Sequence, residues 1–134
     1  MAVPAAQQRL VASAAMPSQW PPVSYESWSE TCDTLHAHTQ LLGKLAVALA
    51  PPEPELQHAA LRLTARGWET GPMPAPNGSG ALAFRLDLHG HEAVVEHSDA
   101  SASRIALTPD RPVGEVAREV LEAARTVGGD FEIN

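Results

Sequence analysis

Residues 82–96, LAFRLDLHGHEAVVE, decide the fold of this chain. Apolar side chains at every second position from 82 to 88 alternate with small or charged ones, which is the pattern of a half-buried β-strand. The His-Gly step at 89–90 is typical of a tight turn, and the apolar pair at 94–95 begins a returning strand. This stretch therefore predicts an antiparallel hairpin.

The segments around the hairpin predict its neighbours. Residues 61–66 and 104–107 alternate in the same way and predict two more strands. In residues 28–50, apolar side chains recur with a period of 3.6, and a Pro-Pro pair follows. Residues 112–127 have the same period and are followed by a Gly-Gly pair. Both predict helices. Residues 71–80, rich in Pro and Gly, predict a long loop that is either a lid over a site or a flexible connection.

The order of these elements predicts an α+β fold. We expect a long N-terminal helix, a mostly antiparallel sheet of about four to five strands and a second helix. Residues 130–133 then alternate again and predict a final strand that a partner completes. Residues 1–19 are expected to form a flexible tail, without the apolar core of a secretion signal, and residues 20–134 a single α+β domain.

Composition excludes several classes of function. The chain has 134 residues and a net charge of −7, and its nine Lys and Arg form no basic stripe of the kind that nucleic-acid binding requires. The longest apolar run, at 45–50, is far shorter than the roughly 20 residues of a membrane span. The single cysteine, Cys32, has no partner for an internal disulfide. We expect a soluble cytoplasmic protein that contacts neither nucleic acid nor membrane.

The polar face of the first helix is the strongest functional signal from the residues themselves. Its members are spaced i, i+3, i+4, i+7 and i+8, and they are His36, Thr39, Gln40, Gly43 and Lys44. Gly43 in a helix interior costs about 1 kcal/mol relative to alanine, which favours a close approach to the backbone there. The alternative is an ordinary solvated face with an incidental glycine.

Other polar clusters point to no metal and no cofactor. Cys32 and His36 lie one helical turn apart, but a zinc site needs three or four ligands. His38 lies about 200° around the helix from His36 and cannot share a site with it. The histidines near the hairpin tip, His89 and His91, are interpreted as exposed turn residues. The sequence contains no phosphate-binding loop, nucleophile elbow or zincin motif.

Two blocks of the sequence carry a family signature. The first comprises Trp20, Pro21, Tyr25, Trp28, Thr31, Thr34, Leu35, His36, Thr39, Gln40, Gly43 and Lys44. The second comprises Thr64, Ala65, Arg66, Gly67 and Pro72. In both, the chain resembles the bacterial family DUF5996, a domain of unknown function. A weaker third stretch, Asp87, His91, Ser98 and Asp99, also fits, although Ala100 stands where a glycine is expected. Members of that family are about twice as long, so the chain resembles their N-terminal half.

A half-length member implies a second protein subunit that supplies the rest. The split form is similar to two-component proteins of the azinomycin and vazabitide pathways, in which two small subunits together close an aziridine ring by expelling sulfate. The resemblance implies a substrate with an amine next to a carbon that bears a sulfate ester, carried on an acidic amino-group carrier protein. Neither a metal nor a nucleotide is implied.

That reaction needs a neutral amine, a fixed geometry and positive charge where the sulfate departs. We assign Lys44 and Arg66 to the sulfate and His36 to the proton of the ammonium group. Thr39, Gln40, Gly43, Thr64, Trp20 and Trp68 are the expected substrate-binding residues. Two alternatives stay open: the base is a carboxylate of the partner, or the chain is a non-catalytic binding or scaffold subunit. Arg66, beside a sharp turn, also has the simpler interpretation of capping a sheet edge.

Overall fold

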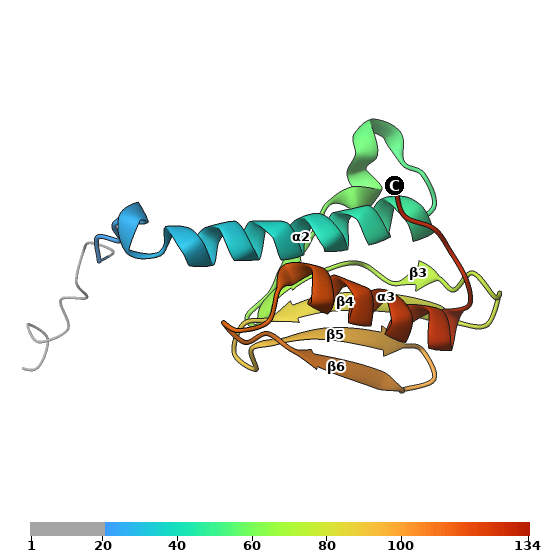
Figure 1. The fold of residues 1–134 in the computed structure, drawn as a ribbon. Helices are drawn as coiled ribbons and strands as arrows, with labels where there is room; N and C mark the ends of the chain where they lie inside the picture. The colour runs from blue at the N-terminus through green and yellow to red at the C-terminus, as the bar shows by residue number, and fades with distance from the viewer. Residues whose placement is uncertain (1–20) are drawn as a thin grey trace, which may run out of the picture.

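The structure, a computed structural model, describes residues 21–134 and has two layers, an antiparallel sheet and two helices on one of its faces (Figure 1). In chain order, the elements are η1 Tyr25–Ser27, α2 Ser29–Leu49, η2 Pro54–Ala59, β1 Arg62–Leu63, β2 Gly67–Glu69, β3 Met73–Pro74, β4 Ala81–Asp87, β5 Glu92–His97, β6 Ala102–Ala106 and α3 Val113–Gly128. The α+β prediction is confirmed. The predicted tail at 1–19 lies outside the described residues.

The sheet has the strand order β1-β2-β4-β5-β6, and β3 pairs with β4 beyond the end of β2. Every pairing is antiparallel. The predicted hairpin is β4 and β5, which pair from Leu82 opposite His97 to Asp87 opposite Glu92. Because side chains alternate along each strand, this register places Phe84 beside Val95 and Leu86 beside Ala93 on the same face.

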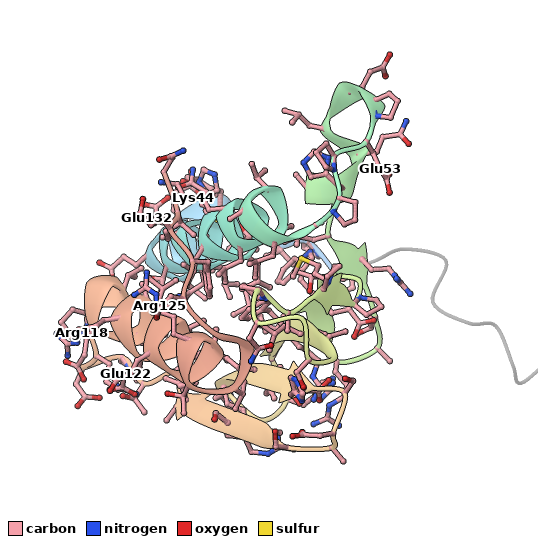
Figure 2. The ribbon with its side chains drawn as sticks, turned by 90° about the vertical axis from the view of Figure 1, so that its right-hand side faces the viewer. Lys44, Glu53, Arg118, Glu122, Arg125 and Glu132 are labelled. Atoms are coloured by element: carbon pink, nitrogen blue, oxygen red, sulfur yellow. The ribbon has the colours of Figure 1, made fainter. Side chains whose placement is uncertain are left out.

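The core lies between that face and the helices. From β4, Leu82, Phe84 and Leu86 are at most 1 % exposed. The helices meet them with Leu41, Leu42, Leu45 and Ala46 of α2 and Val116, Val120 and Ala124 of α3. Full burial of one large apolar side chain contributes about 1.5–3 kcal/mol. This packing fixes α2 over β3 and β4, and α3 over β4, β5 and β6. Arg118 and Glu122 lie on the outer side of α3 (Figure 2), whereas Arg125 donates to the Phe131 carbonyl of the C-terminal segment.

The opposite face of the sheet is closed by ion pairs. Arg85 of β4 contacts Glu96 of β5 at 3.0 Å, and Arg104 of β6 contacts Glu92 of β5 at 2.7 Å. Both pairs bridge adjacent strands, where opposite charges are favourable neighbours. The arginines flank Val94, which is 1 % exposed although it lies on the face without helices. These two ion pairs therefore cover the middle of this face.

The first helix agrees with its prediction to within one residue at each end, but its buried face differs in part. Trp28 falls on the apolar side of the 3.6-residue repeat, which predicts a core position, but it is 40 % exposed. It precedes α2 and packs edge-on against Tyr25, with 6.4 Å between the ring centroids. The reason is that the first turns of α2 extend beyond the sheet (Figure 1), so no core exists beneath them. The buried stripe instead begins at His38.

Three predicted segments differ from expectation. The strand predicted at 61–66 is reduced to β1, with Leu63 73 % exposed, because Thr64 N–H donates to the Gly67 carbonyl and closes a turn that leads into β2. The loop at 71–80 contains β3, with Met73 and Ala75 buried, and then a turn in which Ala75 N–H donates to the Gly80 carbonyl at 3.0 Å. It therefore extends the sheet, and none of its residues lines either of the two hollows described below. Residues 130–133 are not assigned to a strand, and they run from α3 back toward α2 (Figure 1) with Phe131 and Ile133 half-buried against the core. Completion of a strand there by a partner stays a prediction.

Candidate functional site

The predicted polar stripe lies on the side of α2 that faces away from the sheet. His36, Gln40 and Lys44 are exposed there. Gln40 Nε2 lies 3.2 Å from His36 Nε2, which is hydrogen-bond distance. Thr39 is half-buried, and its hydroxyl donates to the His36 carbonyl at 2.8 Å. Within this chain, the stripe is a row of solvent-facing groups held by bonds along the helix.

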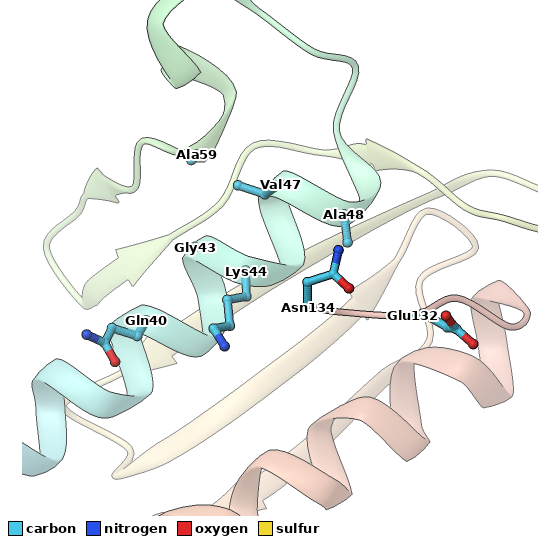
Figure 3. A pocket seen from close by; sticks show the side chains of 8 residues that line it. All are labelled: Gln40, Gly43, Lys44, Val47, Ala48, Ala59, Glu132 and Asn134. Atoms are coloured by element: carbon cyan, nitrogen blue, oxygen red, sulfur yellow. The ribbon is translucent and has the colours of Figure 1, made fainter.

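Lys44 lines an open groove of about 690 Å³ (Figure 3). Turns of α2 at Gln40, Gly43 and Lys44 form part of it, and Ala59 of η2 and the C-terminal residues 132 and 134 complete its lining. A Cβ added to Gly43 meets no atom within 4 Å, so the described chain does not use the close approach that the glycine permits. No ion pair to Lys44 occurs among residues 21–134. The groove thus combines a cation that has no ion-pair partner in the described chain, the carboxylate of Glu132 and bare helix backbone.

Arg66 and Thr64 belong to a different place, the turn between β1 and β2. Thr64 N–H donates to the Gly67 carbonyl at 2.8 Å, and Arg66 N–H donates to Thr64 Oγ1 at 3.2 Å. The Arg66 guanidinium donates from Nε to Asp87 Oδ2 at 2.6 Å. Trp68, half-buried in β2, pairs with Leu86 across the sheet. The structure therefore brings Lys44, Gln40 and Gly43 together and leaves Arg66 outside their groove. Trp20 lies outside the described residues.

The Asp87 carboxylate is buried where the turn between β1 and β2 meets the turn between β4 and β5. Its Oδ1 accepts the backbone N–H groups of His89 at 3.0 Å and Gly90 at 2.8 Å, while its Oδ2 accepts from Arg66. The Gly90 hydrogen bond, more than the Arg66 contact, lowers the pKa of Asp87 against the opposing effect of burial. The ionised carboxylate ties the β4–β5 turn to the β1–β2 turn. Arg66 in this contact acts as the cap of a sheet edge.

Sequence reasoning missed a second concavity, a pocket of about 410 Å³ that we call the His38 pocket. It lies between the first half of α2, the β4–β5 turn and the segment from β6 to α3. His38 is only 4 % exposed, and its Nδ1 has no hydrogen-bond partner among the described residues. Burial lowers the pKa of His38, so its imidazole is neutral at pH 7.

A signal for His38 exists in the sequence. Position 38 shares the apolar face of the helix with 42 and 45, so the spacing places a titratable side chain among leucines. The family signature also converges there: Thr31, Thr34 and Leu35 of its first block line the pocket, together with Asp87 and His91 of its third stretch. These residues are distant in sequence and meet only in the fold.

The described residues offer no obvious metal site and no membrane span. Within residues 21–134, no cluster of three or more His, Cys, Asp or Glu side chains is placed to hold a metal ion. Cys32 is a half-buried free thiol. Neither α2 nor α3 nor any other described helix combines the length and apolar character that a bilayer crossing requires.

The fold and its hollows define a small two-layer α+β domain with a groove and a pocket at different positions along one helix. The chain belongs to the family of unknown function DUF5996, whose profile matches residues 20–134. No curated protein and no solved structure matches the chain. Family membership therefore fixes no activity, and the geometry of the two hollows carries the functional argument.

The buried imidazole generates a prediction about stability. A buried polar group without a partner costs about 1–3 kcal/mol, so His38→Leu should raise the free energy of unfolding by about 1 kcal/mol at pH 7.5. The lowered pKa means that the unfolded chain binds the proton more tightly, so the wild type loses stability as the pH falls below 6.5. The gain from His38→Leu should therefore be larger at pH 5.

Urea denaturation at the two pH values measures both effects. His36→Leu, the same change on the exposed side of α2, serves as the control and should alter stability little at either pH. A loss of stability in His38→Leu at pH 7.5 contradicts an unpartnered imidazole.

Proposed function

We propose that this chain is one subunit of a two-protein cytoplasmic enzyme that closes an aziridine ring by displacing sulfate with a neighbouring amine. The observation that carries the proposal is the state of Lys44, the only lysine of the sequence. It lies exposed in an open groove beside the bare backbone of Gly43, without an ion-pair partner among the described residues. Such a groove has the features of half a site, and the resemblance to split aziridine-forming proteins supports a second subunit as the other half.

The proposed reaction balances without an added cofactor. A base first removes a proton from the ammonium group of the substrate. The neutral nitrogen then forms a bond to the adjacent carbon while the carbon–oxygen bond to sulfate breaks, and sulfate leaves with the electron pair. The resulting aziridinium loses its second proton to solvent. Positive charge at the departing oxygen and a fixed attack geometry are the two contributions that a protein makes to such a step, and orientation alone is worth up to about 7–11 kcal/mol.

Within this scheme, Lys44 is the cation for the leaving sulfate, and a compact ammonium group suits a single leaving oxygen. His36 is the candidate base on this chain. It lies on the same exposed face, one turn before Gln40 and two turns before Lys44, and its Nε2 is within hydrogen-bond distance of Gln40. Arg66 is a weaker candidate than Lys44, because its guanidinium is engaged by Asp87. A carboxylate of the second subunit is the other candidate for the base.

The charge of the chain bears on the carrier protein. A net charge of −7 repels an acidic carrier over most of this surface. We therefore assign docking of the carrier mainly to the second subunit, with Lys44 reserved for the small sulfate group.

The alternative function, a non-catalytic scaffold subunit, has an observation in its favour. Val47 is 50 % exposed in the groove next to Gly43, and Ala48 is exposed beside it. A glycine flanked by apolar side chains permits close helix packing against another protein. Measuring the rate of sulfate release distinguishes the two functions. If the chain is only a scaffold, this rate does not depend on the charge of Lys44.

The proposed chemistry is tested in the complex with the protein encoded by the neighbouring gene. Sulfate release and ring formation are followed on a carrier-bound amino sulfate ester. Lys44→Gln should lower the rate at least about tenfold without weakening the complex, because removal of one group that stabilises transition-state charge typically has at least that effect. Arg118→Gln, on the outer side of α3, is the matched control and should retain the full rate. An unchanged rate in Lys44→Gln removes Lys44 from the mechanism.

The open space at Gly43 gives a second prediction. Gly43→Ala should stabilise the isolated chain by about 1 kcal/mol, since alanine is the better helix former and a Cβ meets nothing there. The same change should weaken binding of the second subunit at least about tenfold if that subunit packs against the backbone, as one overpacked contact costs about 1–3 kcal/mol. Urea denaturation and calorimetry measure the two effects.

Gly114→Ala in α3, also with open space around its Cβ, is the control and should leave binding unchanged. Undiminished binding by Gly43→Ala contradicts a partner seated on this part of α2.

A further inference from the structure

We propose that the His38 pocket binds a small primary amine with an apolar group, whose ammonium is held by Glu30 and the imidazole of His38. The pocket shares no lining residue with the Lys44 groove, and the inference goes beyond ring closure because it needs neither a second subunit nor a sulfate ester. It assigns a ligand class to a site that lies within this chain alone.

The residues that line the pocket suit a small molecule. Its lining includes the buried side chains of His38 and Val116, and the half-buried Leu35, Leu88 and Leu107 add apolar surface. Its exposed lining residues include Glu30 and Thr31 near the start of α2. Polar and charged residues make up the rest of the lining, and a hollow that combines apolar surface with convergent polar groups can hold a small amphipathic ligand.

The burial of His38 without a hydrogen-bond partner for Nδ1 is a second, independent observation in favour of a ligand site. The neighbours of His38 on the buried stripe of α2 are leucines, and a leucine at 38 would avoid the cost of a buried ring nitrogen without a partner. Buried polar groups are nearly always hydrogen-bonded, so an unpartnered one beside a cavity marks a place where another molecule can supply the bond.

The charges around the pocket decide the class of ligand. Two cations lie near it, and each is already engaged. Arg66 donates from Nε and from a terminal nitrogen to Asp87. Arg111 donates from Nε and one terminal nitrogen to Glu115, at 3.2 and 2.9 Å, contacts Glu119 as well, and donates from its other terminal nitrogen to the Ala106 carbonyl. An anionic ligand would find no unpaired cation in this lining.

Among the charged side chains of this lining, the one without an ion-pair partner in the described part of the chain is a carboxylate. The Asp87 carboxylate is saturated, because it accepts two backbone N–H groups and two bonds from Arg66. Among the described residues, the Glu30 carboxylate has no ion-pair partner and accepts no side-chain hydrogen bond. A neutral imidazole keeps one nitrogen as an acceptor. A carboxylate and a neutral imidazole beside leucine side chains favour a ligand with N–H donors, a positive charge and an apolar tail.

The test uses the isolated wild-type chain and three isosteric probes: 3-methylbutylamine, 3-methylbutanol and 3-methylbutanoate. The amine should bind with the highest affinity by calorimetry and shift the imidazole resonances of His38 in NMR spectra. The alcohol should bind at least about tenfold more weakly, because it lacks the charge that pairs with Glu30. The carboxylate should bind least.

Two variants locate the binding. Glu30→Gln and His38→Leu should each weaken binding of the amine at least about tenfold while remaining folded, whereas Glu122→Gln on the outer side of α3 should bind as the wild type does. Glu30→Gln keeps the proposal testable even if His38→Leu changes the core. Absence of amine binding, equal or tighter binding of the carboxylate, or undiminished binding in both variants overturns the proposal. None of these outcomes depends on ring closure.

Discussion

The packing of one stripe of α2 against β4 determines what every other part of the helix can do. Leu42 and Leu45 are at most 1 % exposed, and they meet Leu82, Phe84 and Leu86, whose direction is fixed by the β4–β5 register. Rotation of α2 by a single position would expose these leucines, and each contributes about 1.5–3 kcal/mol when buried. The phase of the helix is therefore set by its central turns.

This orientation of α2 places side chains of the same helix in two different environments, solvent and protein interior. Lys44 and His36 are turned to solvent, where a cation costs nothing to maintain and is available to an incoming group. His38 is turned into the interior, where the charged form of an imidazole is penalised and its pKa falls. One helix thus carries a solvated cation at its groove and a neutral imidazole at its pocket, and our two proposals assign sulfate to the first and an ammonium group to the second.

Local patterns predicted the elements that local forces dominate. The period-2 repeat at 82–96 gave the correct hairpin, and the 3.6 repeat with its two prolines placed α2 to within one residue. The site could be predicted only in part. The exposed stripe at 36, 40 and 44 followed from helix geometry alone, but the burial of His38 depends on where the sheet lies under α2. The Arg66–Asp87 ion pair joins turns that are 21 residues apart, and no local pattern reveals it. β3 was missed because a two-residue edge strand containing a proline has little strand signal.

The central claim is that a second subunit covers the Lys44 groove, and the chemical reactivity of Lys44 tests it most directly. As the only lysine, its ε-amine is identified without ambiguity after acetylation with acetic anhydride and peptide mass spectrometry. In the free chain Lys44 should react as an exposed lysine does. In the complex with the neighbouring gene's product, its acetylation should slow at least about tenfold, because a covered amine is largely excluded from solvent. Equal reactivity of Lys44 in a demonstrated complex would contradict the account.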